Sequence, residues 1–320
     1  MRALSVLFSV GLLVTGFVIF SRRIQWDEIA RIWLHFHVVW LMAALVLYWI
    51  QYPLASWRQY IIIDWLTGLG VDRLLGYPLV LRLTSAAGFV AAAAPIGLMG
   101  DIAKILGLKA LTRLSLANAT RCVFFDRMVG IQWMAVLGLA TLPLQLTTDV
   151  APSIIVAQVA LFTGIAVGVV AVLIMPRLLG LLRNKLVDRI AQLFVGYGTM
   201  LVPARSVTQL VIAALNLASA GSTLYALTVA AGLSISPWLV LAFIPLLQFI
   251  NSLPFLYLGW GGREFAMVAT LGSAGGLSVN EALSISAAWG AVLMIAGAVN
   301  GLFLIGPWKP QTMNAEFLRD

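Results

Sequence analysis

Long apolar runs separated by short polar connections dominate the chain. Runs of about 17 to 25 mostly apolar residues recur along it, and each is long enough to cross the hydrocarbon core of a bilayer. The pattern predicts an all-α polytopic membrane protein with about eight membrane helices. These are expected near 4–20, 38–56, 79–97, 122–143, 153–175, 207–230, 238–258 and 283–305.

No stretch of soluble composition is long enough to form a separate domain. We therefore expect one helical membrane domain over residues 1–305 and a short polar tail over 306–320. A faint repeat of a Leu-Ser-containing segment indicates two weakly related halves, about 1–143 and 153–305, as broken segments in two halves of a transporter would. Chance similarity between apolar segments is the alternative.

Composition excludes a soluble protein. The chain is 62% hydrophobic and 10% charged, with a mean hydropathy of +1.00, whereas soluble proteins carry about 25% charged residues. The net charge of +8 lies in short connections between apolar runs. This distribution fits positive-inside topology and contact with anionic head groups, so no nucleic-acid partner is expected.

The basic residues also predict an orientation. The connection 176–206 is rich in Lys and Arg and is expected in the cytoplasm, whereas 144–152 and 231–237 contain neither and are expected outside. The expected location is a bacterial cytoplasmic (inner) membrane.

Charges follow helix breakers near residue 100. Pro95 and Gly100 interrupt an apolar run, and Asp101 and Lys104 come directly after them. Proline removes a helix hydrogen bond, and charges beside interrupted membrane helices are costly and usually mark a substrate path. We predict an interrupted or re-entrant segment near 95–119. A helix cap with a local Asp–Lys pair is the simpler alternative.

Charged residues also follow helix-breaking residues near residue 260, where the proline and glycines are more numerous. Arg263 and Glu264 follow one proline and three glycines, namely Pro254, Gly259, Gly261 and Gly262. Backbone that leaves a helix at membrane depth must be buried in protein or line a wet cavity. A helix N-terminus stabilises anions, and arginine offers a donor fork that suits phosphate. A second interrupted or re-entrant segment is predicted near 254–276, with a solvated interfacial ion pair as the alternative.

Asp126 and Arg127 open a long apolar run between the two breaks. Adjacent residues point to different sides of a helix, so each needs its own partner. The plausible pairs are Asp126 with Lys104 or Arg121, and Arg127 with Asp101 or Glu264.

Several signatures of enzymes are missing from the sequence. It contains no His-Glu-x-x-His metal pair, no Gly-x-Ser-x-Gly elbow and no phosphate loop. We therefore expect no catalytic residue set, no metal and no cofactor. Asn251 is a polar residue inside an apolar run, and it is a candidate for lining a cavity, with a helix–helix hydrogen bond as the alternative.

These segments resemble the membrane region of lysylphosphatidylglycerol synthases and of related stand-alone, flippase-like membrane proteins. In that family an apolar helix ends in Pro and Gly before an acid and a base, and an acid–Arg pair opens the next helix. Leu-Pro, a Gly-rich turn and Arg-Glu follow near the end. The matching segments here are Pro95–Lys104, Asp126-Arg127 and Leu253–Glu264, within a likeness that covers about residues 1–305.

The chain departs from the family at three positions. Asp101 and Asp126 stand where the family often has Glu, and Gly130 stands where it often has an acid. The sequence also contains no soluble aminoacyl-transfer segment. The resemblance therefore implies lipid handling by the membrane module and not lysyl transfer.

The leading hypothesis is a lipid translocase, or a lipid-binding membrane protein, for an anionic or lipid-linked substrate. In it three cations hold the phosphate, namely Arg263, Arg127 and Lys104, and three carboxylates orient them, namely Asp101, Asp126 and Glu264. One alternative is a membrane-embedded transferase that acts on a lipid-linked substrate, although neighbouring cations make these carboxylates poor general acids. Another is an accessory subunit of a lipid-modifying enzyme. The expected partners are a phospholipid or lipid-linked substrate, the bilayer and such an enzyme.

Overall fold

The computed structural model describes an all-α polytopic membrane protein. It covers residues 25–68, 75–94, 97–112, 114–179 (175–179 by backbone alone), 194, 196–253, 256, 259–305 and 308, and no strand occurs among them. Among the described residues, five helices are long and apolar enough to cross a membrane, namely Val38–Thr67, Leu116–Ala140, Pro152–Ile174, Pro203–Ala230 and Val279–Leu304. The predicted helix at 4–20 and most of the tail at 306–320 lie outside the described residues.

The first crossing is longer than the apolar pattern predicts. Helices α3 (Val38–Trp49) and α4 (Gln51–Thr67) follow each other almost without interruption, whereas the sequence predicted an end near residue 56. Polar residues that break the apolar pattern, Arg58 and Gln59, are covered by protein here, so the helix continues past them. It ends at Gly68, which adopts the left-handed conformation common at helix ends.

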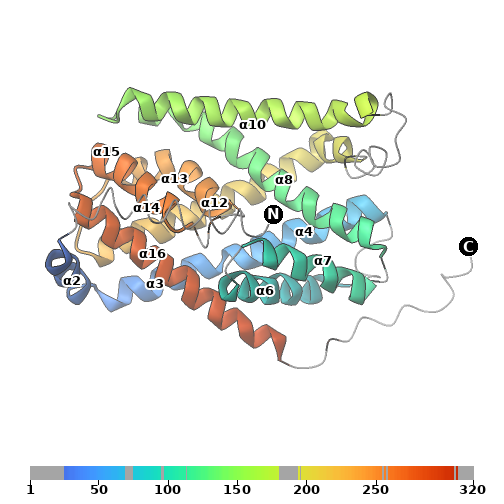
Figure 1. Ribbon diagram of the computed structural model, residues 1–320, viewed down its shortest axis with the longest axis horizontal. Coiled ribbons are helices and arrows are strands. Elements are labelled where there is room, and N and C mark those ends of the chain that lie inside the picture. Colours follow the sequence, from blue (N-terminus) through green and yellow to red (C-terminus); the bar gives the residue numbers. More distant parts are fainter. Residues whose placement is uncertain are drawn as a thin grey trace, which may run out of the picture.

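The crossings alternate between two ends of the molecule (Figure 1). The start of α3 lies beside the end of α12 (Pro203–Ala230), where the backbone N–H of His37 donates to the Ala230 carbonyl at 2.9 Å. At the other end, Ile62 of α4 packs with Tyr197 of the short 3-10 helix η1 (Tyr197–Leu201). Helices α3–α4 and α12 are therefore antiparallel.

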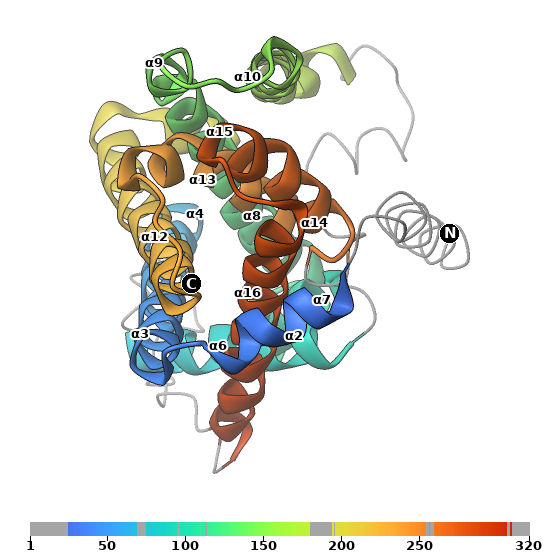
Figure 2. The same cartoon turned by 90° about the vertical axis from the view of Figure 1, so that its left-hand side faces the viewer.

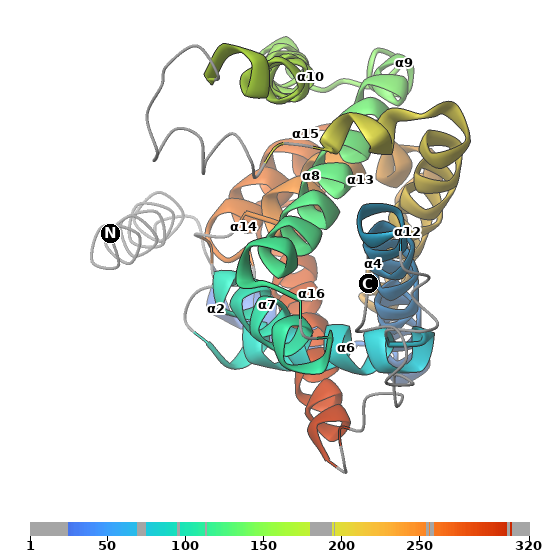
Figure 3. The same ribbon diagram turned by 90° about the vertical axis from the view of Figure 1, so that its right-hand side faces the viewer.

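The remaining crossings are α8 (Leu116–Ala140), α10 (Pro152–Leu179) and α16 (Val279–Asn300). Helix α10 lies on the outside of the bundle in Figures 2 and 3. Two short helices lie outside the crossings and the hairpins, α2 (Trp26–Leu34) and α9 (Leu142–Gln145), and η3 (Gly301–Leu304) extends the last crossing.

A first helical hairpin is formed by α6 (Tyr77–Ala93) and α7 (Leu98–Thr112), which pack against each other. Their 17 and 15 residues correspond to about 25 and 22 Å, less than the roughly 30 Å of a hydrocarbon core. The hairpin begins at the end where α4 stops, and α8 starts from that same end (Figure 3). The segment predicted near 95–119 thus contains parts of two helices, because α7 stops at Thr112 and Ser115 caps a new helix.

A second helical hairpin enters from the opposite end. Its first arm is α13 (Pro237–Asn251), and its second arm is a continuous helical segment over 262–275. That segment comprises α14 (Gly262–Met267), a π-helical turn (Val268–Gly272) and α15 (Ser273–Gly275). Both arms join the end where α12 stops and α16 begins (Figure 2).

The main hydrophobic core surrounds the second hairpin. Phe243 and Leu247 of α13, Met267 of α14 and Trp289 of α16 are fully buried in one cluster with residues of α12. The first hairpin packs on α4, α8 and α16 instead. The two hairpin turns consequently approach each other from opposite ends inside the bundle.

Candidate functional site

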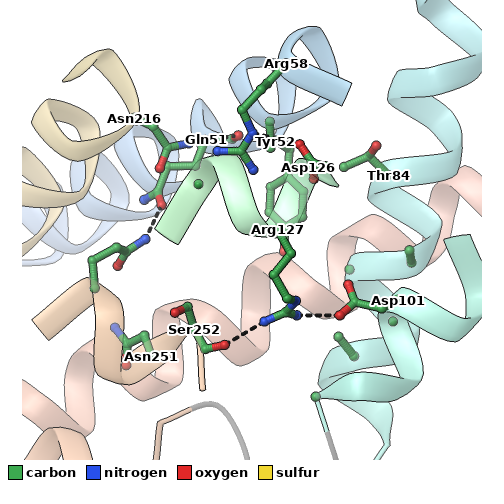
Figure 4. Close-up of a pocket in the computed structure, with 18 of the residues that line it drawn as sticks. Gln51, Tyr52, Arg58, Thr84, Asp101, Asp126, Arg127, Asn216, Asn251 and Ser252 are labelled. Carbon is green, nitrogen blue, oxygen red and sulfur yellow. Dashed lines mark hydrogen bonds and ion pairs between the residues drawn. The ribbon is translucent and has the colours of Figure 1, made fainter. Parts of the chain in front are cut away.

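A cavity of about 360 Å³ lies between the turns of the two hairpins (Figure 4). Much of its wall is made of small or apolar residues such as Ala, Gly and Leu. Its polar lining residues are Tyr48, Gln51, Tyr52, Arg58, Thr84, Asp101, Lys104, Asp126, Arg127, Asn216, Gln248, Asn251 and Ser252. Five of the predicted site residues, those at 101, 104, 126, 127 and 251, are thus brought together in one place.

Asp126 lies between two cations on different helices. The Arg58 Nε donates to one carboxylate oxygen at 2.7 Å, and the Lys104 Nζ lies 3.8 Å from the other. A Cβ at Gly130, one turn further along α8, would stand 3.0 Å from a terminal nitrogen of Arg58. Glycine at this position therefore leaves room for the guanidinium against α8.

The predicted pair Asp126–Lys104 is confirmed, and the alternative pair Asp126–Arg121 is wrong. Arg121 lies near the start of α8, where its guanidinium donates to the Asn118 side chain at 3.4 Å. Five residues separate Arg121 from Asp126, which places the two on different faces of the helix.

Arg127 connects the two hairpins. Its Nη2 lies 2.6 Å from the carboxylate of Asp101 at the start of α7, and its Nη1 donates to the Ser252 carbonyl at 2.7 Å. Ser252 directly follows α13 in the second hairpin. The predicted pair Arg127–Asp101 is confirmed, whereas the alternative with Glu264 is wrong because Glu264 has partners of its own.

The cavity has an excess of positive charge. Three cations (Arg58, Lys104 and Arg127) face two carboxylates (Asp101 and Asp126), which leaves +1. Within the described part of the chain, neither the terminal NH₂ groups of Arg58 nor the Lys104 ammonium has a hydrogen-bond acceptor. These donors are available to an anion that enters the cavity.

Amide side chains line the side of the cavity opposite Asp101 in Figure 4. Gln248 donates to the Gln51 side chain at 3.0 Å, and Asn216 donates to the Gln51 carbonyl at 3.4 Å. The Gln51 Nε2 and both amide atoms of Asn251 are buried without a partner. A buried polar group left unpaired costs about 1–3 kcal/mol, and these amide atoms have almost no accessible surface.

Arg263 and Glu264 do not line the cavity. Arg263 is fully buried, where its Nε donates to Ser286 at 3.0 Å and its Nη2 to Glu264 at 2.9 Å. Glu264 also accepts from the backbone N–H of Gly261 at 2.6 Å and from the Ser286 hydroxyl at 2.8 Å. The guanidinium lies over the ring of Trp260, 5.2 Å from its centroid. This Arg–Glu pair is part of a network that fixes α14 against α16.

The predicted glycine breaks have distinct structural roles. Gly259 and Gly261 have positive φ angles of 77° and 84°, which other residues rarely adopt. Gly100 allows α7 to approach α6, since a Cβ there would lie 2.8 Å from the Ala87 carbonyl, and a Cβ at Gly262 would lie 2.9 Å from Leu256. The predicted breakers Pro95 and Pro254 lie outside the described residues.

Sequence reasoning missed Arg58 and Gln51. Both belong to the first crossing, and Arg58 falls two positions beyond its predicted end, where a charge looks like part of a loop. The available signal was the apolar stretch that resumes at Tyr60-Ile61-Ile62-Ile63, which places Arg58 inside a helix.

Comparison with known proteins identifies the family. The sequence model of the lysylphosphatidylglycerol synthase transmembrane region matches residues 2–301, which is essentially the whole chain. The chain belongs to this family. A search of the curated proteins finds no match. Together with the apolar helices, the family establishes a multi-pass integral membrane protein related to lipid modification or translocation.

Proposed function

We propose that this protein binds an anionic lipid by its head group and moves it between the two leaflets. The observation that carries the proposal is the cavity between the hairpin turns, with a net charge of +1 inside an apolar helix bundle. Charges at such depth are costly, and they are retained in membrane proteins where a substrate or ion passes.

In this proposal Arg58 and Lys104 contact the phosphate, because their donors face the cavity without acceptors in the described chain. Asp126 holds both cations in place. Arg263, which the sequence favoured for this role, supports the second hairpin instead, because it is buried beside Glu264 and Ser286.

The two hairpins act as re-entrant segments in this proposal. Each is too short to cross the bilayer, and they start from opposite ends, so their turns meet near the middle of the membrane. The polar head group then moves past the turns while the acyl chains stay in lipid. The proposed location is a bacterial inner membrane, with the end at which α10 stops and η1 begins in the cytoplasm.

Translocation in liposomes tests the proposal. The purified protein is reconstituted with a fluorescent phosphatidylglycerol, and a membrane-impermeant reductant reports the fraction in the outer leaflet over time. Wild type should speed up exchange between leaflets, and Lys104→Gln should slow it at least tenfold. Lys109→Gln is the matched control, since Lys109 lies on the same helix, is exposed and does not line the cavity.

Two outcomes would overturn the proposal. One is that no anionic lipid moves faster than in empty liposomes although the protein is folded. The other is that Lys104→Gln and Lys109→Gln have the same rate as wild type. Lipid binding without movement would favour the accessory-subunit alternative. A new head-group product would favour the transferase.

A further inference from the structure

Helix α2 lies at one end of the bundle, and none of its nine residues is buried. We infer that α2 is an interfacial helix, which lies in the plane of the membrane surface and inserts its tryptophan-bearing side among lipids. The partner of this surface is the boundary layer of the bilayer, between the head groups and the first acyl carbons. Apolar contact holds the helix there, and charge does not. The inference goes beyond the proposed function and does not depend on the cavity.

One side of α2 is apolar and is not covered by the described part of the chain. Four exposed residues share this side, namely Trp26, Ala30, Trp33 and Leu34. At 3.6 residues per turn they lie within a sector of about 100°. Trp26 and Leu34 have exposed fractions of 62% and 82%. Apolar side chains of this size are unfavourable in water, and tryptophan favours the boundary between lipid and water.

Another side of α2 is fixed to the bundle. The helix packs on the start of α16, and its Glu28, Ile29 and Ile32 are half-buried. The Asn280 side chain of α16 accepts a hydrogen bond from the Gln25 backbone N–H at 3.1 Å and donates to the Glu28 carboxylate. These contacts set the direction in which the apolar side of α2 faces, which is away from the start of α16.

The position of α2 corresponds to the surface of a membrane. Only three residues separate Leu34 from Val38, where the first crossing begins. The helix therefore ends at the level where the chain enters the bilayer. Figure 2 shows α2 running across this end of the bundle from side to side. The apolar side is continuous with the lipid-facing start of α3, where Val38 and Val39 have exposed fractions of 68% and 79%.

The charges of α2 favour water and do not attract an anionic membrane. Asp27 and Arg31 are exposed beside the apolar side. Asp27 and Glu28 against Arg31 give the helix a net charge of −1. Helices that bind membranes by electrostatics are instead rich in Lys and Arg on the polar side. We therefore expect α2 to lie at the same depth in neutral and in anionic bilayers.

Site-directed spin labelling in liposomes tests the inference. Cys122 is the only cysteine of the sequence and is buried, so Cys122→Ser gives a background without thiols. A single nitroxide is then attached after Trp33→Cys or Arg31→Cys. Both positions are exposed, and they point about 160° apart around the helix. The label at 33 should collide mainly with oxygen, which concentrates in lipid, and the label at 31 with a water-soluble nickel chelate. The ratio of the two collision rates should differ at least fivefold between the positions.

Two results would overturn the inference. One is an equal ratio at positions 31 and 33. The other is a label at 33 that meets neither reagent, because protein would then cover this side of α2, either another part of this chain or a second copy. Trp26→Cys and Asp27→Cys form a second pair of exposed positions if the first pair fails to fold.

The role of apolar contact has its own test. The ratio at position 33 is measured in vesicles of phosphatidylcholine with and without an anionic lipid, and it should be the same in both. A ratio that falls to the value at position 31 in the neutral vesicles would show that charge holds the helix, and it would overturn this part of the inference. Lipid movement is not measured in these experiments, so their failure is distinct from failure of the proposed function.

Discussion

The two hairpins carry similar sequence signals in different surroundings. In each, an acid and a base follow a helix break. In the first, Asp101 and Lys104 retain side-chain exposures of 19% and 13%, and both line the cavity. In the second, Arg263 has no exposure and contacts Glu264 directly. The same kind of break thus places charges on a cavity wall in one hairpin and inside the packed protein in the other.

The spacing of the charges explains the difference. Asp101 and Lys104 are three residues apart on one face of α7, and each finds its partner on α8, in Arg127 and Asp126 respectively. The first hairpin is therefore tied to a neighbouring crossing across a cavity. Arg263 and Glu264 are adjacent in sequence, and they contact each other and the Ser286 hydroxyl of α16.

The largest expected effect is on the stability of the second hairpin. Glu264→Gln removes the carboxylate that contacts the fully buried Arg263 guanidinium. Breaking a buried ion pair from one side costs about 3–5 kcal/mol. Chemical unfolding in detergent micelles should show this loss, and Asp101→Asn in the first hairpin should cost clearly less. Equal losses would mean that the two hairpins do not differ in the way described.

The next effect concerns the connection between the hairpins. Arg127→Gln removes the ion pair to Asp101 and the hydrogen bond to the Ser252 carbonyl. A hydrogen bond to a charged group contributes about 1.5–3 kcal/mol. Backbone hydrogen exchange should therefore increase around 98–101 and 249–252. Arg205→Gln, at a half-buried site near the start of α12, is the control, and similar exchange in both variants would contradict the role of Arg127.

A smaller effect is expected at the turn of the second hairpin. Gly259→Ala strains a backbone with φ 77° and places a Cβ against the Asn251 side chain. The backbone strain alone costs about 1–2 kcal/mol. Gly232→Ala has the same strain (φ 70°) with no atom near the new Cβ. Both variants should lose stability in the unfolding assay, but only Gly259→Ala should slow lipid movement.

The smallest expected effect comes from a change in the net charge of the cavity. Gly130→Asp adds a carboxylate beside the terminal nitrogens of Arg58 and should cancel the net charge of +1. We expect anionic lipid binding to weaken by about 1 kcal/mol, roughly fivefold. Gly130→Ala, which adds bulk without charge, is the control. A loss of binding equal in the two variants would assign the effect to crowding.

The fold was largely predictable because long apolar runs leave few alternatives. The crossings predicted at 122–143, 153–175, 207–230 and 283–305 lie mainly in one observed helix each, namely α8, α10, α12 and α16. The predicted end of the first crossing came too early because Arg58 and Gln59 interrupt its apolar pattern. Sequence alone does not reveal that a neighbouring helix covers such residues, since Asp126 is 68 positions away from Arg58.

The candidate site was predictable only in part. The breaks near residues 100 and 260 correctly located both hairpin turns, and two of the four suggested ion pairs are observed. Arg263 was expected to bind phosphate because it has a basic side chain and follows a proline and three glycines that interrupt a helix. Its burial depends on how α14 packs on α16, where Gly290 leaves space for the guanidinium, and this cannot be read from residue order.

The opposed entry of the two hairpins has an electrical consequence. In the proposed re-entrant arrangement, the charges between the turns lie away from both ends of the bundle and within the voltage drop across the membrane. Moving one elementary charge through that drop takes about 2.3 kcal/mol per 100 mV. The empty cavity carries +1, and a singly charged head group makes it neutral. In the proposed movement the head group carries its negative charge past turns that stay in place, so membrane voltage should change the rate of the loaded step.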